Sequence, residues 1–138
     1  MPESRSFWGG ISAINGGQDI PDIPQKILKD QAEFLTSQTK GILIGEVVEG
    51  VKPKNSIYSC HLRITVPALG HYIYNVLKIN YPIEEIYPGT VISSHDEKYE
   101  CKDVDEYEAI LERILSSEQL KHIVSLLLAQ ASIELKSI

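Results

Sequence analysis

Cysteine and long apolar runs are scarce in this sequence. The two cysteines, Cys60 and Cys101, are too few for a disulfide framework, so a reduced cytoplasmic protein is expected, with a disulfide across a sheet as the alternative. The longest apolar stretch, Ile123 to Ala131, contains Ser125 and Gln130 and is too short to span a bilayer. No basic segment followed by an apolar run opens the chain, so neither a signal peptide nor a membrane partner is expected.

Positive charge is scarce as well. The chain has 13 Lys and Arg against 19 Asp and Glu, a net charge of −6, and its basic residues form no run of three. Binding to a phosphate backbone needs clustered Lys and Arg, so nucleic acid is not an expected partner. Seven carboxylates gather between Asp96 and Glu108. A solvated turn and helix start would explain them, because carboxylates stabilise helix N-termini, and a surface for a basic partner is the alternative.

The common catalytic and metal-binding motifs are also missing. The sequence has no Gly-x-Ser-x-Gly, no His-Glu-x-x-His and no dinucleotide fingerprint. Its four histidines show no paired ligand spacing, so neither a metal nor a cofactor is expected. These absences favour a binding protein over an enzyme.

Residues 1–22 differ in composition from the rest of the chain. The glycine pairs at 9–10 and 16–17 disfavour regular structure. The segment nevertheless contains bulky apolar residues, including the only tryptophan, Trp8, so we expect an arm that lies across the domain or a partner. Trp8 is a candidate binding residue, although a single tryptophan in such a segment is more often an anchor that packs against the protein. Residues 23–138 are expected to form a single domain.

The first regular element is predicted to be a helix over residues 24–39. Pro24 suits the first helical turn, and Gly41 suits the end. Between them, apolar residues at helical spacing, including Phe34, indicate one amphipathic face.

Extended segments follow, and they predict a four-stranded antiparallel β-meander. The segments are Ile42–Glu49, Asn55–Val66, His71–Asn80 and Thr90–Ser93, with Lys98–Cys101 as a weaker candidate for a fifth strand. Alternate residues from Tyr58 to Val66 are apolar, the pattern of a half-buried strand. By the same alternation, Ile73 is expected on the apolar face of its strand and Tyr72 and Tyr74 on the other.

Two helices are predicted to close the chain. Asp103 and Glu106 have the spacing of a capping box, and Ser116 or Ser117 suits the start of the second helix. Both helices show apolar stripes that we expect to pack on the sheet. The predicted fold class is therefore α+β: an N-terminal helix, a four-stranded antiparallel β-meander and two C-terminal helices packed on the sheet.

Two Tyr-Pro pairs mark the end of the meander. Proline lacks the N–H that a strand ladder uses and restrains the residue before it to extended conformations. Residues 81–88, from Tyr81-Pro82 to Tyr87-Pro88, are therefore expected to form an ordered, unpaired connection.

The two cysteines are expected to differ. Neighbouring residues of a strand point to opposite faces, so Cys60 and His61 cannot form a catalytic pair, and Cys60 is expected in the core. Cys101 lies in a segment expected to be exposed, close to a helix start that would lower its pKa and to acids that would raise it. We expect a structural or surface thiol, with a reactive cysteine as the alternative.

The element order and the segments Ile79–Pro82 and Ile86–Val91 resemble the ubiquitin-conjugating-enzyme-like superfamily over roughly residues 24–131. Its non-catalytic RWD domains carry a YPxxxP-type connection after the third strand, although Ile86 stands here where the second proline belongs. A conjugating enzyme would have His-Pro-Asn before its catalytic cysteine, whereas here Asp96 follows His95. The resemblance therefore implies the non-catalytic version.

Taken together, these features predict a non-catalytic protein-interaction module, such as an immunity, inhibitor or adaptor-type protein, that binds another protein. The candidate binding residues are Trp8, Tyr72, Tyr74, Tyr81 and Tyr87. One alternative is an enzyme that forms a thioester at Cys101. Another is a small-ligand binding domain that uses Tyr72 or Tyr74. Homo-oligomerisation through the arm or an edge strand is also left open.

Overall fold

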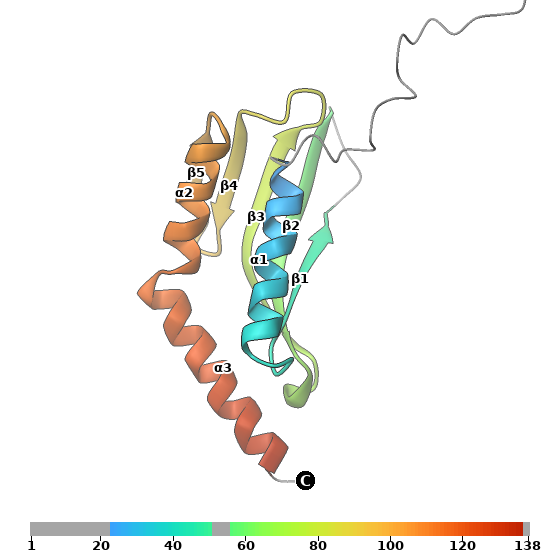
Figure 1. Ribbon diagram of the computed structural model, residues 1–138, viewed down its shortest axis with the longest axis vertical. Coiled ribbons are helices and arrows are strands. Elements are labelled where there is room, and N and C mark those ends of the chain that lie inside the picture. Colours follow the sequence, from blue (N-terminus) through green and yellow to red (C-terminus); the bar gives the residue numbers. More distant parts are fainter. Residues whose placement is uncertain (1–22, 51–55, 137–138) are drawn as a thin grey trace, which may run out of the picture.

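The computed structural model describes residues 23–50 and 56–136 and confirms the α+β class. Three helices and one antiparallel sheet make up this part of the chain (Figure 1). The helices are α1 (Pro24–Gln38), α2 (Val104–Leu115) and α3 (Glu118–Lys136), with a short 3₁₀ helix, η2 (Pro67–Leu69). The strands are β1 (Ile44–Glu49), β2 (Ile57–Val66), β3 (Tyr72–Pro82), β4 (Gly89–Ser93) and β5 (Lys98–Cys101). The predicted N-terminal arm and Trp8 lie outside the described residues.

The sheet is a meander in the order β1-β2-β3-β4-β5, so the prediction of four strands is wrong by one. The fifth strand pairs with β4 from Lys98, opposite Ile92, to Cys101, opposite Gly89. Its four residues alternate only twice between inward and outward positions, too briefly for the sequence pattern to distinguish a strand from a turn.

A β-bulge in β3 reverses the predicted faces of residues 72–74. Leu77 lies opposite Leu62 and Asn75 lies opposite Arg63, which leaves Val76 as the extra residue. One inserted residue moves every side chain before it to the other face. Tyr72 and Tyr74 therefore share the helix-covered face with Val66 and Ile64, while Ile73 is 45% exposed on the opposite face; the alternation-based assignment was wrong here.

Helix α1 packs directly on the backbone of β1. Leu28 and Ala32 are buried against the sheet. A Cβ atom at Gly45 would lie only 2.5 Å from the carbonyl oxygen of Ala32, so no larger residue fits beneath the helix. The Gly45 N–H donates to the Thr36 hydroxyl at 2.9 Å and fixes the helix along the strand.

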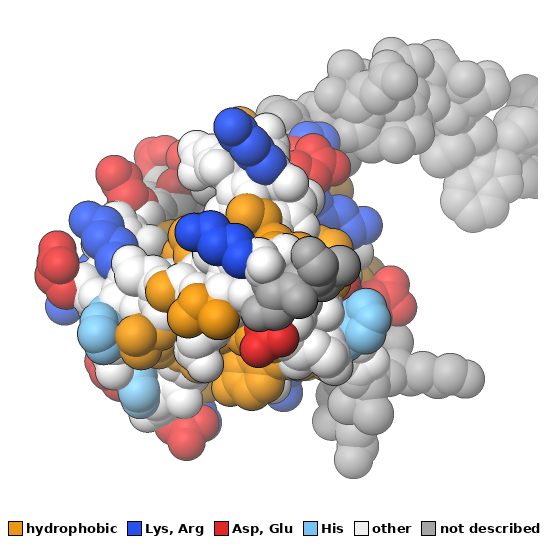
Figure 2. All heavy atoms as spheres, turned by 90° about the horizontal axis from the view of Figure 1, so that it is seen from below, with side chains coloured by type: hydrophobic (Ala, Val, Ile, Leu, Met, Phe, Trp, Pro, Cys, Tyr) orange, Lys and Arg blue, Asp and Glu red, His pale blue; other side chains and the backbone are white. Residues whose placement is uncertain are grey.

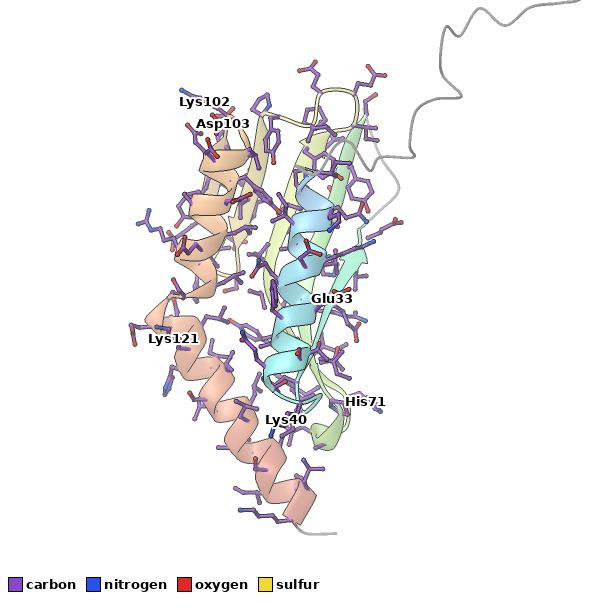
Figure 3. The ribbon with its side chains drawn as sticks, in the orientation of Figure 1. Glu33, Lys40, His71, Lys102, Asp103 and Lys121 are labelled. Atoms are coloured by element: carbon purple, nitrogen blue, oxygen red, sulfur yellow. The ribbon has the colours of Figure 1, made fainter. Side chains whose placement is uncertain are left out.

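Helix α2 covers β4 and β5, and its predicted capping box is confirmed. The Glu106 N–H donates to Asp103 Oδ1 at 2.9 Å, and the Lys102 N–H donates to the Glu106 carboxylate at 2.8 Å. Figure 3 shows Asp103 and Lys102 at this end of α2. The helix therefore begins at a fixed place on the sheet, beside the first turn of α1 (Figure 1).

Helix α3 is arranged differently from the prediction. It continues past the end of α2 and packs against η2 instead of lying along the sheet (Figure 1). Leu127 and Ala131 are buried, whereas Leu126 and Ile133 on its other side are exposed. The prediction that both C-terminal helices pack on the sheet holds for α2. The predicted apolar stripe of α3 is packed against the core, but its main contact is η2, because an apolar stripe does not specify what covers it.

The first Tyr-Pro pair belongs to the sheet, contrary to prediction. Tyr81 lies opposite Tyr58, and Pro82 ends β3 opposite Ile57, where its missing N–H interrupts no further ladder bond. The connection is therefore shorter than expected, running from 83 to 88, and the Tyr87-Pro88 peptide bond within it is cis. The Ile86 N–H donates to the Pro82 carbonyl at 2.7 Å and closes this turn.

Candidate functional site

The tyrosines singled out in the sequence lie at opposite ends of the sheet. Tyr72 and Tyr74 are at the end of β3 next to η2, whereas Tyr81 and Tyr87 are at the other end. Tyr81 is only 6% exposed, and burial raises the pKa of its hydroxyl to about 12, which fits a core residue. These four residues therefore do not converge on one site.

The buried hydroxyl of Tyr107 joins α2 to α1. It donates to the Pro24 carbonyl at 2.8 Å, across 83 residues of sequence. Burial raises the pKa of this hydroxyl well above its usual value, so it stays protonated and keeps donating. The Tyr87 ring packs edge-on against Tyr107, with centroids 6.3 Å apart. The two helices are thus held at a fixed separation where both begin.

Cys101 is fully buried, so the expectation of an exposed segment is wrong at this residue. It lies opposite Gly89 on the helix-covered face of the sheet. Burial raises the pKa of its thiol, and Glu106, Asp103 and Glu100 raise it further. Because the thiolate is the nucleophile, this environment works against covalent chemistry at Cys101.

Cys60 is in the core, as predicted, and burial raises the pKa of its thiol to about 12. Both cysteines are free thiols. They lie on β2 and β5, which two other strands separate at about 4.8 Å per strand spacing, too far for a disulfide. Among residues 23–50 and 56–136, no cluster of three or more His, Cys, Asp or Glu could hold a metal ion.

A cleft with a volume of about 860 Å³ lies between α1 and α2, and we call it the α1–α2 cleft. The two helices lie side by side on the same face of the sheet (Figure 1). The lining comes from Ile27, Asp30, Gln31, Glu33, Phe34 and Ser37 of α1, Glu108, Leu111, Glu112 and Leu115 of α2, and Ser116.

The apolar lining of this cleft was not recognised in the sequence. Phe34 is 57% exposed, although its spacing assigned it to a buried helical face. It projects beside Leu111 and Leu115, one turn apart on α2. The sequence contained one signal for this: the apolar stripe in helix 24–39 is wider than the contact with the sheet requires. Leu28 and Ala32 make that contact, so Phe34 is not needed for it.

Both walls of the cleft carry negative charge. Asp30 and Glu33 come from α1, and Glu108 and Glu112 come from α2. No Lys, Arg or His belongs to the described lining. Lys26 bridges to Asp30 at 3.0 Å, whereas the other three carboxylates form no ion pair with the described part of the chain. Figure 3 shows Glu33 midway along α1.

A second cleft, of about 390 Å³, continues the first between α1 and α3. Gln31, Phe34 and Leu115 line both cavities, so Phe34 stands where they meet. Ile64 and Val76 of the sheet form its floor. The exposed aromatic ring is thus at the centre of one extended apolar surface.

Two further cavities border Tyr74. One, of about 240 Å³, has a mixed polar and apolar lining that includes His95, Glu97 and Arg113. The other, of about 510 Å³, is apolar and lies between Tyr72, Tyr74 and the Leu126 side of α3. Figure 2 views the molecule from the end that carries η2 and the last turns of α3, where apolar side chains reach the surface among charged ones.

Neither family models, curated proteins nor solved structures gave a match to this chain. The helices described here include none with the length and apolar character needed to cross a membrane.

Proposed function

We propose that this protein is a non-catalytic protein-interaction module that receives part of its partner in the α1–α2 cleft. The observation that carries the proposal is the half-exposed ring of Phe34 above the leucines of α2. Aromatic side chains in pockets that a partner can desolvate supply much of the energy of protein–protein interfaces. An immunity, inhibitor or adaptor-type protein is the kind of module we propose.

The chemistry of the lining supports binding over catalysis. A covalent mechanism needs a nucleophile with a base in hydrogen-bond reach. The described lining offers the hydroxyls of Ser37 and Ser116 and four carboxylates, but the Ser116 hydroxyl donates to the Glu112 backbone carbonyl, and within the described residues neither serine is hydrogen-bonded to a carboxylate. Cys101, the candidate for thioester formation, is buried on the sheet with a raised thiol pKa.

The walls of the cleft are fixed before any partner arrives. The Tyr107–Pro24 hydrogen bond ties the helices together at one end, and Gly45 lets α1 sit tightly on β1. Binding to preformed walls avoids the free-energy cost of ordering them. The cleft is therefore suited to recognition of one defined segment.

A photoreactive phenylalanine analogue at position 34 tests the proposal in the native host. Position 73, on the opposite face and also exposed, is the matched control. We expect a discrete cross-linked protein from position 34 and none from position 73. The absence of any adduct from position 34, or identical adducts from both, would contradict the proposal.

A small apolar ligand bound beside Tyr72 and Tyr74 is the second candidate function. The cavity of about 510 Å³ there falls within the usual size range of ligand sites. Thermal-shift screening addresses this alternative, because a ligand that binds the native state raises the melting temperature. Loss of a measured shift in Leu126→Asp would locate the ligand in this cavity.

A further inference from the structure

We infer that the occupant of the α1–α2 cleft is an amphipathic α-helix with basic residues on both sides of its apolar stripe. The inference rests on the proposed function and adds the chemistry of the partner. It follows from the shape of the cleft and from the charge of its two walls.

The shape of the cleft fits a helix. Residues 27 to 37 of α1, residues 108 to 115 of α2 and the C-cap Ser116 form its walls, so it is about 15 Å long at 1.5 Å per helical residue. A helix of three turns spans that length and presents apolar residues at positions i, i+3 or i+4, and i+7. Phe34, Leu111 and Leu115 are the groups that such a stripe would contact.

Other modes of peptide recognition fit less well. An extended peptide adds to a free sheet edge, but the edges here are β1 and β5, and the cleft lies above the sheet between two helices. A polyproline segment needs a groove lined by several aromatic rings. Phe34 is the single aromatic residue among the described residues that line the cleft.

The charge of the cleft then selects among amphipathic helices. Carboxylates stand on both walls, at Asp30 and Glu33 on one side and at Glu108 and Glu112 on the other. Three of them lack a partner cation in ion-pair range within the described residues. Basic residues on both flanks of the occupant would pair with them, whereas acidic flanks would be repelled.

The chain itself supplies no suitable occupant. Residues 1–22 are apolar enough, but they contain Glu3, Asp19 and Asp22 against Arg5 alone. The exposed side of α3 is apolar as well, yet Glu118 and Glu134 balance the two lysines of that helix. Neither a second copy of the chain nor its own N-terminal segment therefore has the basic charge that would complement the acidic walls of the cleft.

A pair of synthetic peptides tests the inference on the full-length chain. Both are helical 14-mers with the same leucine stripe; one has lysine at the flanking positions and the other has glutamate. Fluorescence anisotropy gives each affinity, and NMR shift mapping locates each site. We expect the lysine peptide to bind at the cleft, and the glutamate peptide to bind at least about tenfold more weakly.

Matched variants separate the effect of the carboxylates in the cleft from the effect of the net charge of the protein. E33Q/E108Q/E112Q removes three rim carboxylates, while E84Q/E85Q/E134Q removes three exposed carboxylates that line none of the four cavities described above. We expect the first variant to lose about tenfold in affinity for the lysine peptide and the second to lose about twofold or less. Equal losses would overturn the inference.

The remaining outcomes distinguish failure of the inference from failure of the proposed function. If both peptides bind the cleft equally, or neither binds while position 34 still cross-links a protein, the basic-helix inference fails and the interaction module stands. If no peptide binds and position 34 gives no adduct, both fail. A higher peptide affinity in F7S/W8S, or self-association lost in Phe34→Ser, would show that the chain occupies its own cleft, which also overturns the inference.

Discussion

Two faces of helix α1 carry apolar residues in opposite surroundings. On one face, Leu28 and Ala32 are buried and the helix backbone touches Gly45 of β1. On the other, Phe34 keeps more than half of its surface exposed and borders two clefts. The comparison teaches that apolar residues on one helix divide between holding the fold together and forming a surface for a partner.

The largest effect is expected when a side chain is truncated on the face of α1 that packs on the sheet, which we call the closed face; the face that carries Phe34 is the open face. Leu28→Ala leaves a cavity in the core and should lower the free energy of unfolding by about 3 kcal/mol. Phe34→Ala, on the open face, should cost about 1 kcal/mol or less, because much of the ring is already in water. Urea denaturation of the two variants provides the measurement, and equal losses would remove the distinction between the faces.

A methyl group added beneath the closed face should have the next largest effect. Gly45→Ala puts a Cβ atom against the Ala32 carbonyl, so α1 must shift away from β1, at a cost of about 2 kcal/mol. Gly50→Ala is the control, because a Cβ there approaches nothing closer than 3.4 Å. A melting temperature for Gly45→Ala equal to that of the control would show that the helix does not press on the strand.

Loss of the tether between the cleft walls should have a smaller effect. Tyr107→Phe removes the hydrogen bond to the Pro24 carbonyl, which still accepts from the backbone of its own helix, so the loss should be about 1 kcal/mol. The two walls of the cleft should also become less fixed relative to one another, so the folded variant should bind the lysine 14-mer more weakly than the unmodified protein does. Tyr99→Phe is the control, since that hydroxyl bonds only to Glu97 at the surface. Unchanged peptide affinity in Tyr107→Phe would show that the walls need no tether.

A further effect is expected only at alkaline pH. The buried thiols of Cys60 and Cys101 have raised pKa values, so the folded chain retains protons that the unfolded chain releases above about pH 8.5. Their contribution to stability is therefore present below that pH and is lost as the pH rises toward 12, the approximate pKa of folded Cys60. Iodoacetamide should label neither thiol in the native chain at pH 8.5, and rapid native labelling of Cys101 would revive the thioester hypothesis.

Features with a local cause were predictable from the sequence. Pro24 begins α1, the Asp103–Glu106 capping box begins α2, and Cys60 falls at an inward position of an alternating strand. Each of these depends on residues within a few positions along the chain, where propensity and hydrogen bonding decide the outcome.

The features that failed depend on distant parts of the chain. The bulge at Val76 is set by pairing with Leu62 and Arg63, and it turned Tyr74 inward against the alternation. The exposure of Phe34 depends on where α2 lies, which the sequence of α1 does not contain. The resemblance to RWD domains stays a prediction, as do the partner and any oligomeric state.

One pair of measurements on Phe34→Ala tests most directly whether the open face of α1 serves binding instead of folding. Its unfolding free energy and its affinity for the lysine 14-mer are measured on the same preparation. We predict a stability loss of about 1 kcal/mol or less together with an affinity loss of about tenfold. A stability loss as large as that of Leu28→Ala, with peptide binding unchanged, would contradict the assignment of this face to a partner.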